Sequence, residues 1–290
     1  MRFSVVIPCF NAERTLDQCL VSVTRAAALH GSAEILLVDN GSADASVEIA
    51  AAFPEVTVLH EQRRGPAAAR NRGLRCAVGR FVAFTDADCR VAEDWLVRAE
   101  DYFDDSDVAA VGGRIDGCKP RNAIQHWMNE RGILDQEHAL ASRPPFVQTA
   151  NAVYRTAQVR ACGGFDEQLR TGEDVDLSIR VTLRGGRLTF APDVAVEHDH
   201  RCTWRGLFHQ SRLNASATAY LARKWSCVLP PKSWRTSVWE CQDLARAAAR
   251  AARHVMNSRR DLAFCDFVHR AGRKIGMIQA ARATGVWDRW

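Results

Sequence analysis

Residues 81–89 read FVAFTDADC, an unbroken apolar run that ends in two carboxylates, Asp86 and Asp88, with only Ala87 between them. An uninterrupted apolar run of this length is typical of a strand that is buried on both faces of a parallel sheet. Ligands of open α/β sheets bind beyond the carboxyl ends of the strands, so this D-x-D motif lies where a hard divalent cation could be held. The alternative is that the two aspartates cap a helix that follows them.

The first ninety residues alternate between strand and helix patterns. We expect apolar strands at 3–7, 35–38, 56–59 and 81–84, and helices at 14–29, 43–53 and 67–78. This order predicts an α/β fold with a doubly wound, mostly parallel sheet and right-handed crossovers.

Beyond residue 88 the pattern is less regular. We expect helices at 93–103, 123–140 and 174–183, short strands at 108–111, 153–154, 188–190 and 194–197, and only helices from Trp204 onward, interrupted by Leu229-Pro230-Pro231. Trp127 is expected on the surface of its helix or at an acceptor cleft.

The composition is that of a globular protein, since 47% of the 290 residues are hydrophobic and 25% are charged. No apolar run approaches the roughly 20 residues needed to span a bilayer, and no signal-peptide pattern is visible at the N-terminus. The ten cysteines form no C-x-x-C pair. We therefore expect reduced, mostly buried thiols and a cytoplasmic location.

The net charge of +5 is unevenly distributed, because arginine is frequent from Thr203 onward. Aromatic residues alternate with these arginines, and such basic, Trp-containing helices can lie at the inner face of a membrane. The alternative is that the aromatic side chains pack the helices onto the catalytic domain or onto a second subunit. No nucleic-acid-binding motif is present, so no nucleic-acid partner is expected, and the sequence does not predict an oligomeric state. The residues concerned are Arg205, Arg212, Arg223, Arg235, Arg246, Arg250, Arg253, Arg259, Arg260, Arg270 and Arg273, with Trp204, Leu207, Phe208, Trp225, Trp234, Trp239, Phe264, Phe267, Trp287 and Trp290.

Polar residues follow three of the predicted strands. Strand 3–7 is followed by Pro8-Cys9-Phe10-Asn11 and Glu13, and strand 35–38 by Asp39-Asn40-Gly41-Ser42. Because the carboxyl ends of parallel strands meet at one edge, these residues and the D-x-D motif should border one crevice. Asp39 is suited to accept hydrogen bonds from a base or a ribose, although Asn-Gly is also a common turn.

The dinucleotide fingerprint G-x-G-x-x-G and the P-loop motif are absent, which disfavours dehydrogenases and P-loop enzymes. Gly65-Pro66-Ala67-Ala68-Ala69-Arg70-Asn71 instead begins a helix. Arg70 or Asn71 could contact a phosphate or orient the aspartates. The alternative is a helix of small residues that packs closely on the sheet.

These motifs resemble those of family 2 glycosyltransferases of the GT-A fold. The resemblance covers roughly residues 3–225, whereas residues 226–290 carry no motif of the family. The matching segments, in the order of the family, are Val5-Val6-Ile7-Pro8-Cys9-Phe10-Asn11, Val38-Asp39-Asn40-Gly41-Ser42-Ala43-Asp44, Gly65-Pro66-Ala67-Ala68-Ala69-Arg70-Asn71, Phe84-Thr85-Asp86-Ala87-Asp88, Gly163-Gly164-Phe165-Asp166 and Gly172-Glu173-Asp174-Val175-Asp176-Leu177.

The resemblance implies transfer of a sugar, with inversion, from a nucleoside-diphosphate sugar to an acceptor hydroxyl. UDP is expected as the carrier from its frequency in the family. A bound Mn²⁺ or Mg²⁺ would offset the charge of the leaving diphosphate. Asp88 is implied as its direct ligand, Asp86 as a contact of metal or ribose, and His198 as a further ligand, with His200 as second choice.

Asp174 is implied as the general base that deprotonates the acceptor, and Glu173 as facing the acceptor. The alternative is that Glu173, Asp174 and Asp176 only stabilise the positive end of helix 174–183. Trp204 is a further expected acceptor contact. The expected donor-binding residues are Pro8, Phe10, Asn11, Glu13, Asp39, Gly65, Arg70, Asn71, Asp86, Ala87 and Asn151.

We expect a GT-A catalytic domain over 1–202, with a nucleotide-binding half at 1–90 and an acceptor-binding half at 91–202, and a helical region over 203–290. Residues 210–214 read QSRLN and depart from the Q-x-x-R-W motif of processive relatives. Together with the lack of transmembrane helices, this departure indicates addition of one or a few sugars. The resemblance implies a glycan or lipid-linked acceptor, in cell-surface polysaccharide or glycolipid synthesis.

Two alternatives remain. A sugar-nucleotide pyrophosphorylase should carry a Gly-rich, Arg-containing loop after its first strand, but residues 8–15 lack glycine. A catalytically degenerate relative would bind nucleotide sugars or partners without turnover, and intact Asp86, Asp88 and Asp174 argue against it.

Overall fold

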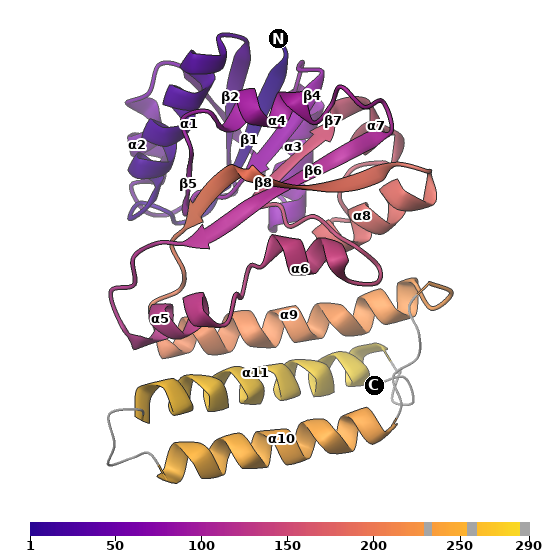
Figure 1. Cartoon of the computed structure of the whole chain (residues 1–290). Helices are drawn as coiled ribbons and strands as arrows, with labels where there is room; N and C mark the ends of the chain where they lie inside the picture. The colour runs from indigo at the N-terminus through magenta and orange to yellow at the C-terminus, as the bar shows by residue number, and fades with distance from the viewer. Residues whose placement is uncertain (229–233, 254–259, 285–290) are drawn as a thin grey trace. The chain divides into compact units, whose positions relative to one another are not determined.

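The computed structural model describes residues 1–228, 234–253 and 260–284 (Figure 1). The chain divides into two compact units. The α/β unit comprises Met1–Cys118, Leu134–Gln168 and Glu173–Asp199, and the helical unit comprises Lys119–Ile133, Leu169–Gly172 and the described residues from His200 onward. The predicted domain division at residues 202 and 203 stays a prediction.

An eight-stranded sheet forms the centre of the α/β unit, in the order β3-β2-β1-β4-β7-β6-β8-β5 (Figure 1). The four N-terminal strands are parallel, and β7 is antiparallel to its neighbours β4 and β6. β8 runs parallel to β6, and β5 is antiparallel to β8. The predicted α/β fold with a mostly parallel sheet is therefore confirmed. The strands are β1 Phe3–Cys9, β2 Ala33–Asp39, β3 Val56–His60, β4 Phe81–Thr85, β5 Cys89–Val91, β6 Val108–Gly117, β7 Asn151–Arg155 and β8 Arg187–His198.

Helices cover both faces of this sheet. Successive side chains of a strand point to opposite faces, so the apolar strands present apolar side chains on both faces, and the helices bury them. Val5 and Ile7 of β1 belong to one apolar cluster with residues of α1, whereas Val6 belongs to a second cluster with residues of α3. α3 lies very close to β1, since a Cβ on Gly73 would come within 2.4 Å of Val6. The helices of this unit are α1 Leu16–His30, α2 Ser46–Ala51, α3 Pro66–Cys76, α4 Trp95–Asp101, α6 Gln136–Ala141, α7 Thr156–Ala161 and α8 Glu173–Leu183.

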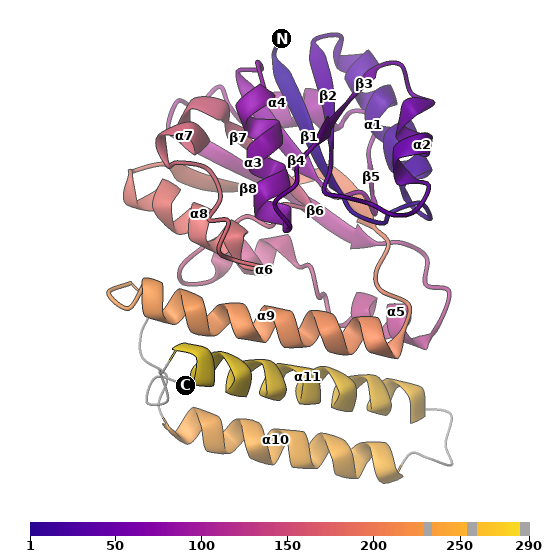
Figure 2. The same ribbon diagram turned by 180° about the vertical axis from the view of Figure 1, so that it is seen from behind.

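The helical unit consists of α5 Ala123–Glu130, α9 Trp204–Lys224, α10 Trp234–Arg253 and α11 Arg260–Thr284. α11 lies between α9 and α10 (Figure 2). Its glycines permit a close approach to α9, since a Cβ on Gly276 would lie 2.0 Å from the carbonyl oxygen of Arg212. Several of the predicted residues lie outside the described side chains: Arg235, Arg253, Arg259, Arg260, Trp234, Trp239, Trp287, Trp290 and the segment 229–231.

The structure corrects four expectations. The prediction of one helix over 123–140 is wrong, because the segment forms two helices, α5 and α6. Gly132 lies between them with a φ of 55°. Trp127 is not on the surface, since it is only 3% exposed and packs with α9 and α11 residues. The strands predicted at 188–190 and 194–197 form one strand, β8. Asp86 and Asp88 do not cap a helix, because they precede the short strand β5.

Among the described residues, none of the helices has both the length and the apolar character that a membrane span requires. Five of the nine cysteines with described side chains are buried.

Candidate active site

The loops after β1 and β2 are joined by hydrogen bonds that involve two of the predicted donor-binding residues. The Oδ1 atom of Asn11 accepts from the backbone N–H of Ala43 at 2.8 Å, and the carboxylate of Glu13 accepts from that of Ala45 at 3.2 Å. Asn11 has a φ of 50°, which asparagine tolerates better than most residues. Asn11 and Glu13 therefore fix one loop against the other.

Asp39 ends β2 as a buried carboxylate. Partial burial alone would raise its pKa, but hydrogen bonds from Ser42 and Gly41 lower the pKa of Asp39 below its ordinary value. The two backbone N–H groups lie 3.0 and 3.1 Å from its oxygens. Asp39 is thus held as an anion that can still accept hydrogen bonds from a ligand.

The next residue, Asn40, connects this loop to the start of α3. Its Oδ1 atom accepts from the N–H of Gly65 at 2.7 Å, and its Nδ2 atom donates to the carbonyl of Glu61 at 2.9 Å. Gly65 has a φ of 129°, a conformation that other residues rarely adopt.

Phe10 presents its ring to solvent, with 54% of the residue exposed, and the guanidinium carbon of Arg64 lies 4.8 Å from the ring centroid. The neighbouring Pro8 lies within β1, paired with Val38 of β2. An exposed ring beside a planar cation offers a stacking surface for a flat ligand group such as a base.

Arg70 of α3 connects the D-x-D motif to the first turn of α8. Its Nη2 atom lies 2.6 Å from Oδ1 of Asp86, and its Nη1 atom lies 2.6 Å from Oε1 of Glu173. Burial disfavours the charged guanidinium, but the two carboxylates raise the pKa of Arg70 and keep it protonated. Arg70 thus contacts Asp86 of the D-x-D motif, and its role at the site stays a prediction.

Asn71 and Asn151, both predicted to contact the donor, use their side chains within the protein. Asn71 donates to the carbonyl of Phe165 at 2.9 Å and accepts from its N–H at 2.8 Å, which holds the Gly-Gly-Phe-Asp loop against α3. Asn151 is fully buried and donates to the carbonyls of Arg114 and Val194 at 2.9 and 2.8 Å. Both residues support the framework of the site.

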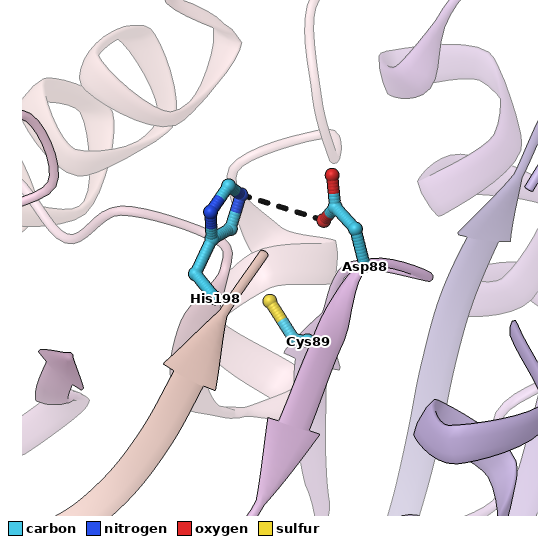
Figure 3. Close-up of side chains that lie close together, drawn as sticks. All are labelled: Asp88, Cys89 and His198. Carbon is cyan, nitrogen blue, oxygen red and sulfur yellow. Dashed lines mark ion pairs between the residues drawn. The ribbon is translucent and has the colours of Figure 1, made fainter. Parts of the chain in front are cut away.

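Asp88 and His198 lie side by side, with Oδ1 of Asp88 at 3.4 Å from Nε2 of His198 (Figure 3). The antiparallel pairing of β5 with β8 causes this proximity, because it sets Cys89 directly opposite His198. The sequence analysis missed β5, since its three residues are too few to show a strand pattern. His200, the alternative ligand, belongs to the helical unit, where its carbonyl accepts from Gln125 at 2.8 Å.

Ligand atoms of Asp88, Cys89 and His198 all lie within 4.8 Å of one another. Carboxylate oxygen and imidazole nitrogen suit Mn²⁺ and Mg²⁺, whereas thiolate is a soft ligand that suits other metals. Burial, followed by the nearby charges of Asp88 and Asp86, raises the pKa of the Cys89 thiol well above its ordinary value. The residues present therefore fit a hard divalent ion held by Asp88 and His198, with Cys89 as a neutral neighbour.

Asp174 lies in the first turn of α8, beside Glu173. Burial, followed by the negative charge of Glu173, raises the pKa of Asp174 to about 7. A carboxylate with a pKa near neutrality is matched to accepting and releasing a proton. Asp176 differs, because it is fully buried and pairs with Arg180, whose Nε lies 2.9 Å from Oδ2.

The two remaining predicted residues are Ala87 and Trp204. Ala87 is buried between the two aspartates, at 7% exposure. Trp204 begins α9 in the helical unit, where its ring packs edge-on against Phe264 with centroids 4.8 Å apart.

Residues 4–163 match the protein family described as Glycosyl transferase family 2. The pre-mycofactocin glycosyltransferase of Mycobacterium tuberculosis is 34% identical over 228 residues, which are 76% of this chain and 47% of that protein. The glycosyltransferase AglE of Haloferax volcanii is 32% identical over 203 residues, which are 68% of this chain and 67% of that one. The chain thus spans about half the length of the first of these relatives.

The fold is also similar to that of a solved structure, the mannosyltransferase PcManGT from Pyrobaculum calidifontis in complex with GDP-Man and Mn²⁺. The TM-score is 0.65 at 21% identity, and the alignment covers all of this chain and 88% of the other. This likeness supports the GT-A form of the α/β fold, and the family match covers more than half of the chain. The chain therefore belongs to glycosyl transferase family 2.

Proposed function

We propose that this protein is a metal-dependent, inverting glycosyltransferase that uses a nucleoside-diphosphate sugar as donor. The observation that carries the proposal is the 3.4 Å approach of Asp88 to His198 at the edge where Asp39 and Asp86 also lie. The relatives support it, because they are named glycosyltransferases, and the similar mannosyltransferase structure contains GDP-Man and Mn²⁺.

The donor would extend from Asp39 to the D-x-D motif. Asp39 accepts hydrogen bonds from the base or the ribose, and Phe10 with Arg64 stacks against the base. Asp88 and His198 would hold Mn²⁺ or Mg²⁺, which supplies positive charge to stabilise the diphosphate leaving group. Asp86 is kept in place by Arg70, so that it can contact the ribose or the ion.

Asp174 would act as the general base that takes the proton from the acceptor hydroxyl. Its raised pKa supports this role, because the base must hold the proton during transfer and release it afterwards. Glu173 is engaged by Arg70, so it positions the start of α8 in addition to any contact with the acceptor. The acceptor we propose is a hydroxyl of a glycan or of a lipid-linked sugar.

The proposal is tested by thermal-shift measurements with UDP-, GDP- and dTDP-sugars, each with and without Mn²⁺. A ligand that binds only the folded protein raises the melting temperature, so one nucleotide should stabilise it, and only when Mn²⁺ is present. NMR should then detect slow hydrolysis of that donor, with inverted configuration in the first sugar formed. If none of the donors shifts the melting temperature, with or without Mn²⁺, the proposal is contradicted.

The same samples separate the alternatives. A pyrophosphorylase would form a nucleoside triphosphate when pyrophosphate is added, and a degenerate relative would bind the donor without releasing any sugar. We expect free nucleoside diphosphate and sugar as the products.

A further inference from the structure

The helical unit contains a cavity of about 320 Å³ that plays no part in the site described above. Its described lining comes from the end of α5, from α10 and from α11. The charged side chains that line it are four cations, Arg131, Arg270, Arg273 and Lys274, and two carboxylates, Asp243 and Asp266. The lining therefore carries an excess of two positive charges.

The positive charges of this cavity share few acceptors. The buried carboxylate of Asp266 accepts from Arg131 at 3.1 Å and from Arg270 at 3.0 Å, and also from Arg250 outside the lining at 3.0 Å. The other lining carboxylate, Asp243, pairs with Arg270 as well. Arg273 has no ion-pair partner within the described residues. Cations that crowd around one carboxylate repel one another, and an anion in the cavity would relieve that repulsion.

Trp127 gives a second, independent observation. It is 3% exposed and lines the cavity, and its indole N–H has no acceptor in the described part of the chain. A buried N–H group without a partner is unfavourable, whereas an oxygen atom of a ligand in the cavity would satisfy it.

The neighbouring ionisable groups agree with an excess of positive charge. Burial and then the positive charge of Arg273 lower the pKa of His269 to about 4, although Asp266 opposes this. Burial, followed by the charges of Arg131 and Arg273, also lowers the pKa of Arg270. His269 is therefore neutral at physiological pH, and the arginines alone supply the positive charge.

We infer that this cavity binds a phosphate group, carried by a soluble phosphorylated molecule or by a lipid headgroup. Guanidinium groups recognise phosphate through paired, charge-assisted hydrogen bonds, and an indole N–H adds a further donor. The inference concerns the helical unit alone and holds whether or not the proposed sugar transfer is correct.

The test is isothermal titration of the full chain with inorganic phosphate and with pyrophosphate at constant ionic strength. We expect saturable binding that Arg273→Gln weakens about tenfold, since one charge-assisted hydrogen bond is lost. Trp127→Phe removes the N–H and should weaken binding about threefold or more. Arg282→Gln makes the same charge change on α11 outside the lining and should leave affinity within about twofold.

Circular dichroism melting identifies any variant that fails to fold. If Trp127→Phe does not fold, the comparison of Arg273→Gln with Arg282→Gln decides the outcome. Absence of saturable binding of phosphate and pyrophosphate, together with absence of sedimentation with vesicles that contain phosphatidic acid, would overturn the inference. So would an equal loss of affinity in Arg273→Gln and Arg282→Gln, because it would show a general effect of surface charge.

Vesicles distinguish the two sources of phosphate. A lipid headgroup would be assigned if the protein sediments with phosphatidylcholine vesicles that contain phosphatidic acid. This sedimentation should be lost in Arg273→Gln and absent with vesicles of pure phosphatidylcholine. Saturable binding of free phosphate without sedimentation would assign a soluble ligand. Failure of both probes contradicts a phosphate site.

Discussion

The two compact units bury charge in opposite ways. In the α/β unit one buried cation, Arg70, lies between the carboxylates of Asp86 and Glu173. In the helical unit one buried carboxylate, Asp266, is shared by three arginines. Since a local excess of charge of one sign is unfavourable unless something balances it, the ligands proposed for the two units carry opposite charges. We propose a cation near the carboxylates of the α/β unit and an anion near the arginines of the helical unit.

The largest effect should follow from replacement of Asp174 in the first turn of α8. Asp174→Asn removes the proposed base, so the transfer rate should fall by a factor of about 10² to 10⁴, while donor affinity is nearly unchanged. Steady-state kinetics and donor titration measure both quantities.

Asp176→Asn provides a matched control two residues away, because Asp176 is paired with Arg180. It should lower stability but retain activity per folded molecule. A near wild-type rate in Asp174→Asn would show that the base lies elsewhere.

The next effect concerns the Arg70 bridge, which consists of the two ion pairs that Arg70 makes with Asp86 and Glu173. Arg70→Gln leaves two carboxylates without their shared cation, so the free energy of unfolding should fall by about 3 kcal/mol in urea titrations. Arg64→Gln, an exposed arginine of the same region, should change it by less than about 0.5 kcal/mol. Equal values for the two variants would mean that the bridge adds no stability.

A smaller effect should appear in the pH dependence. The pKa of Asp174 is about 7 in the folded protein and lies near the ordinary 3.8 when unfolded, so the folded state binds more protons between these values. Stability therefore falls as pH rises through this window. Asp174→Asn should be more stable than wild type at pH 7, and the difference should shrink toward pH 5.

Urea unfolding of the two proteins at several pH values measures this difference. The turnover of wild type should fall as pH decreases below about 7, because protonated Asp174 cannot act as a base. A difference in stability that does not change with pH would contradict the raised pKa.

The smallest effect is expected for Cys89, which lies beside Asp88 and His198 in Figure 3. Cys89→Ala removes a neutral thiol, so Mn²⁺ affinity should stay within about twofold, whereas His198→Ala should reduce it about tenfold or more. Titration of Mn²⁺ followed by electron paramagnetic resonance measures both. A large loss in Cys89→Ala would make the thiol a ligand.

The sequence predicted the regions where a local pattern is strong. Continuous apolar runs located β1 to β4, and the polar residues after them located the edge of the sheet that carries Asp39 and Asp88. Features that depend on distant contacts were missed. β5 has only three residues and is defined by its pairing with β8, and the burial of Trp127 depends on α9 and α11. The bridge from Arg70 to Glu173 joins residues 103 positions apart.

The central claim is that Asp88 and His198 hold the ion that binds the donor diphosphate. Its most direct test is calorimetric titration of UDP and of GDP into wild type and Asp88→Ala, each with and without Mn²⁺. The account predicts that at least one nucleotide binds wild type far more tightly with Mn²⁺ and that Asp88→Ala abolishes this dependence. Affinity that is independent of Mn²⁺ in wild type, or unchanged in Asp88→Ala, would contradict it.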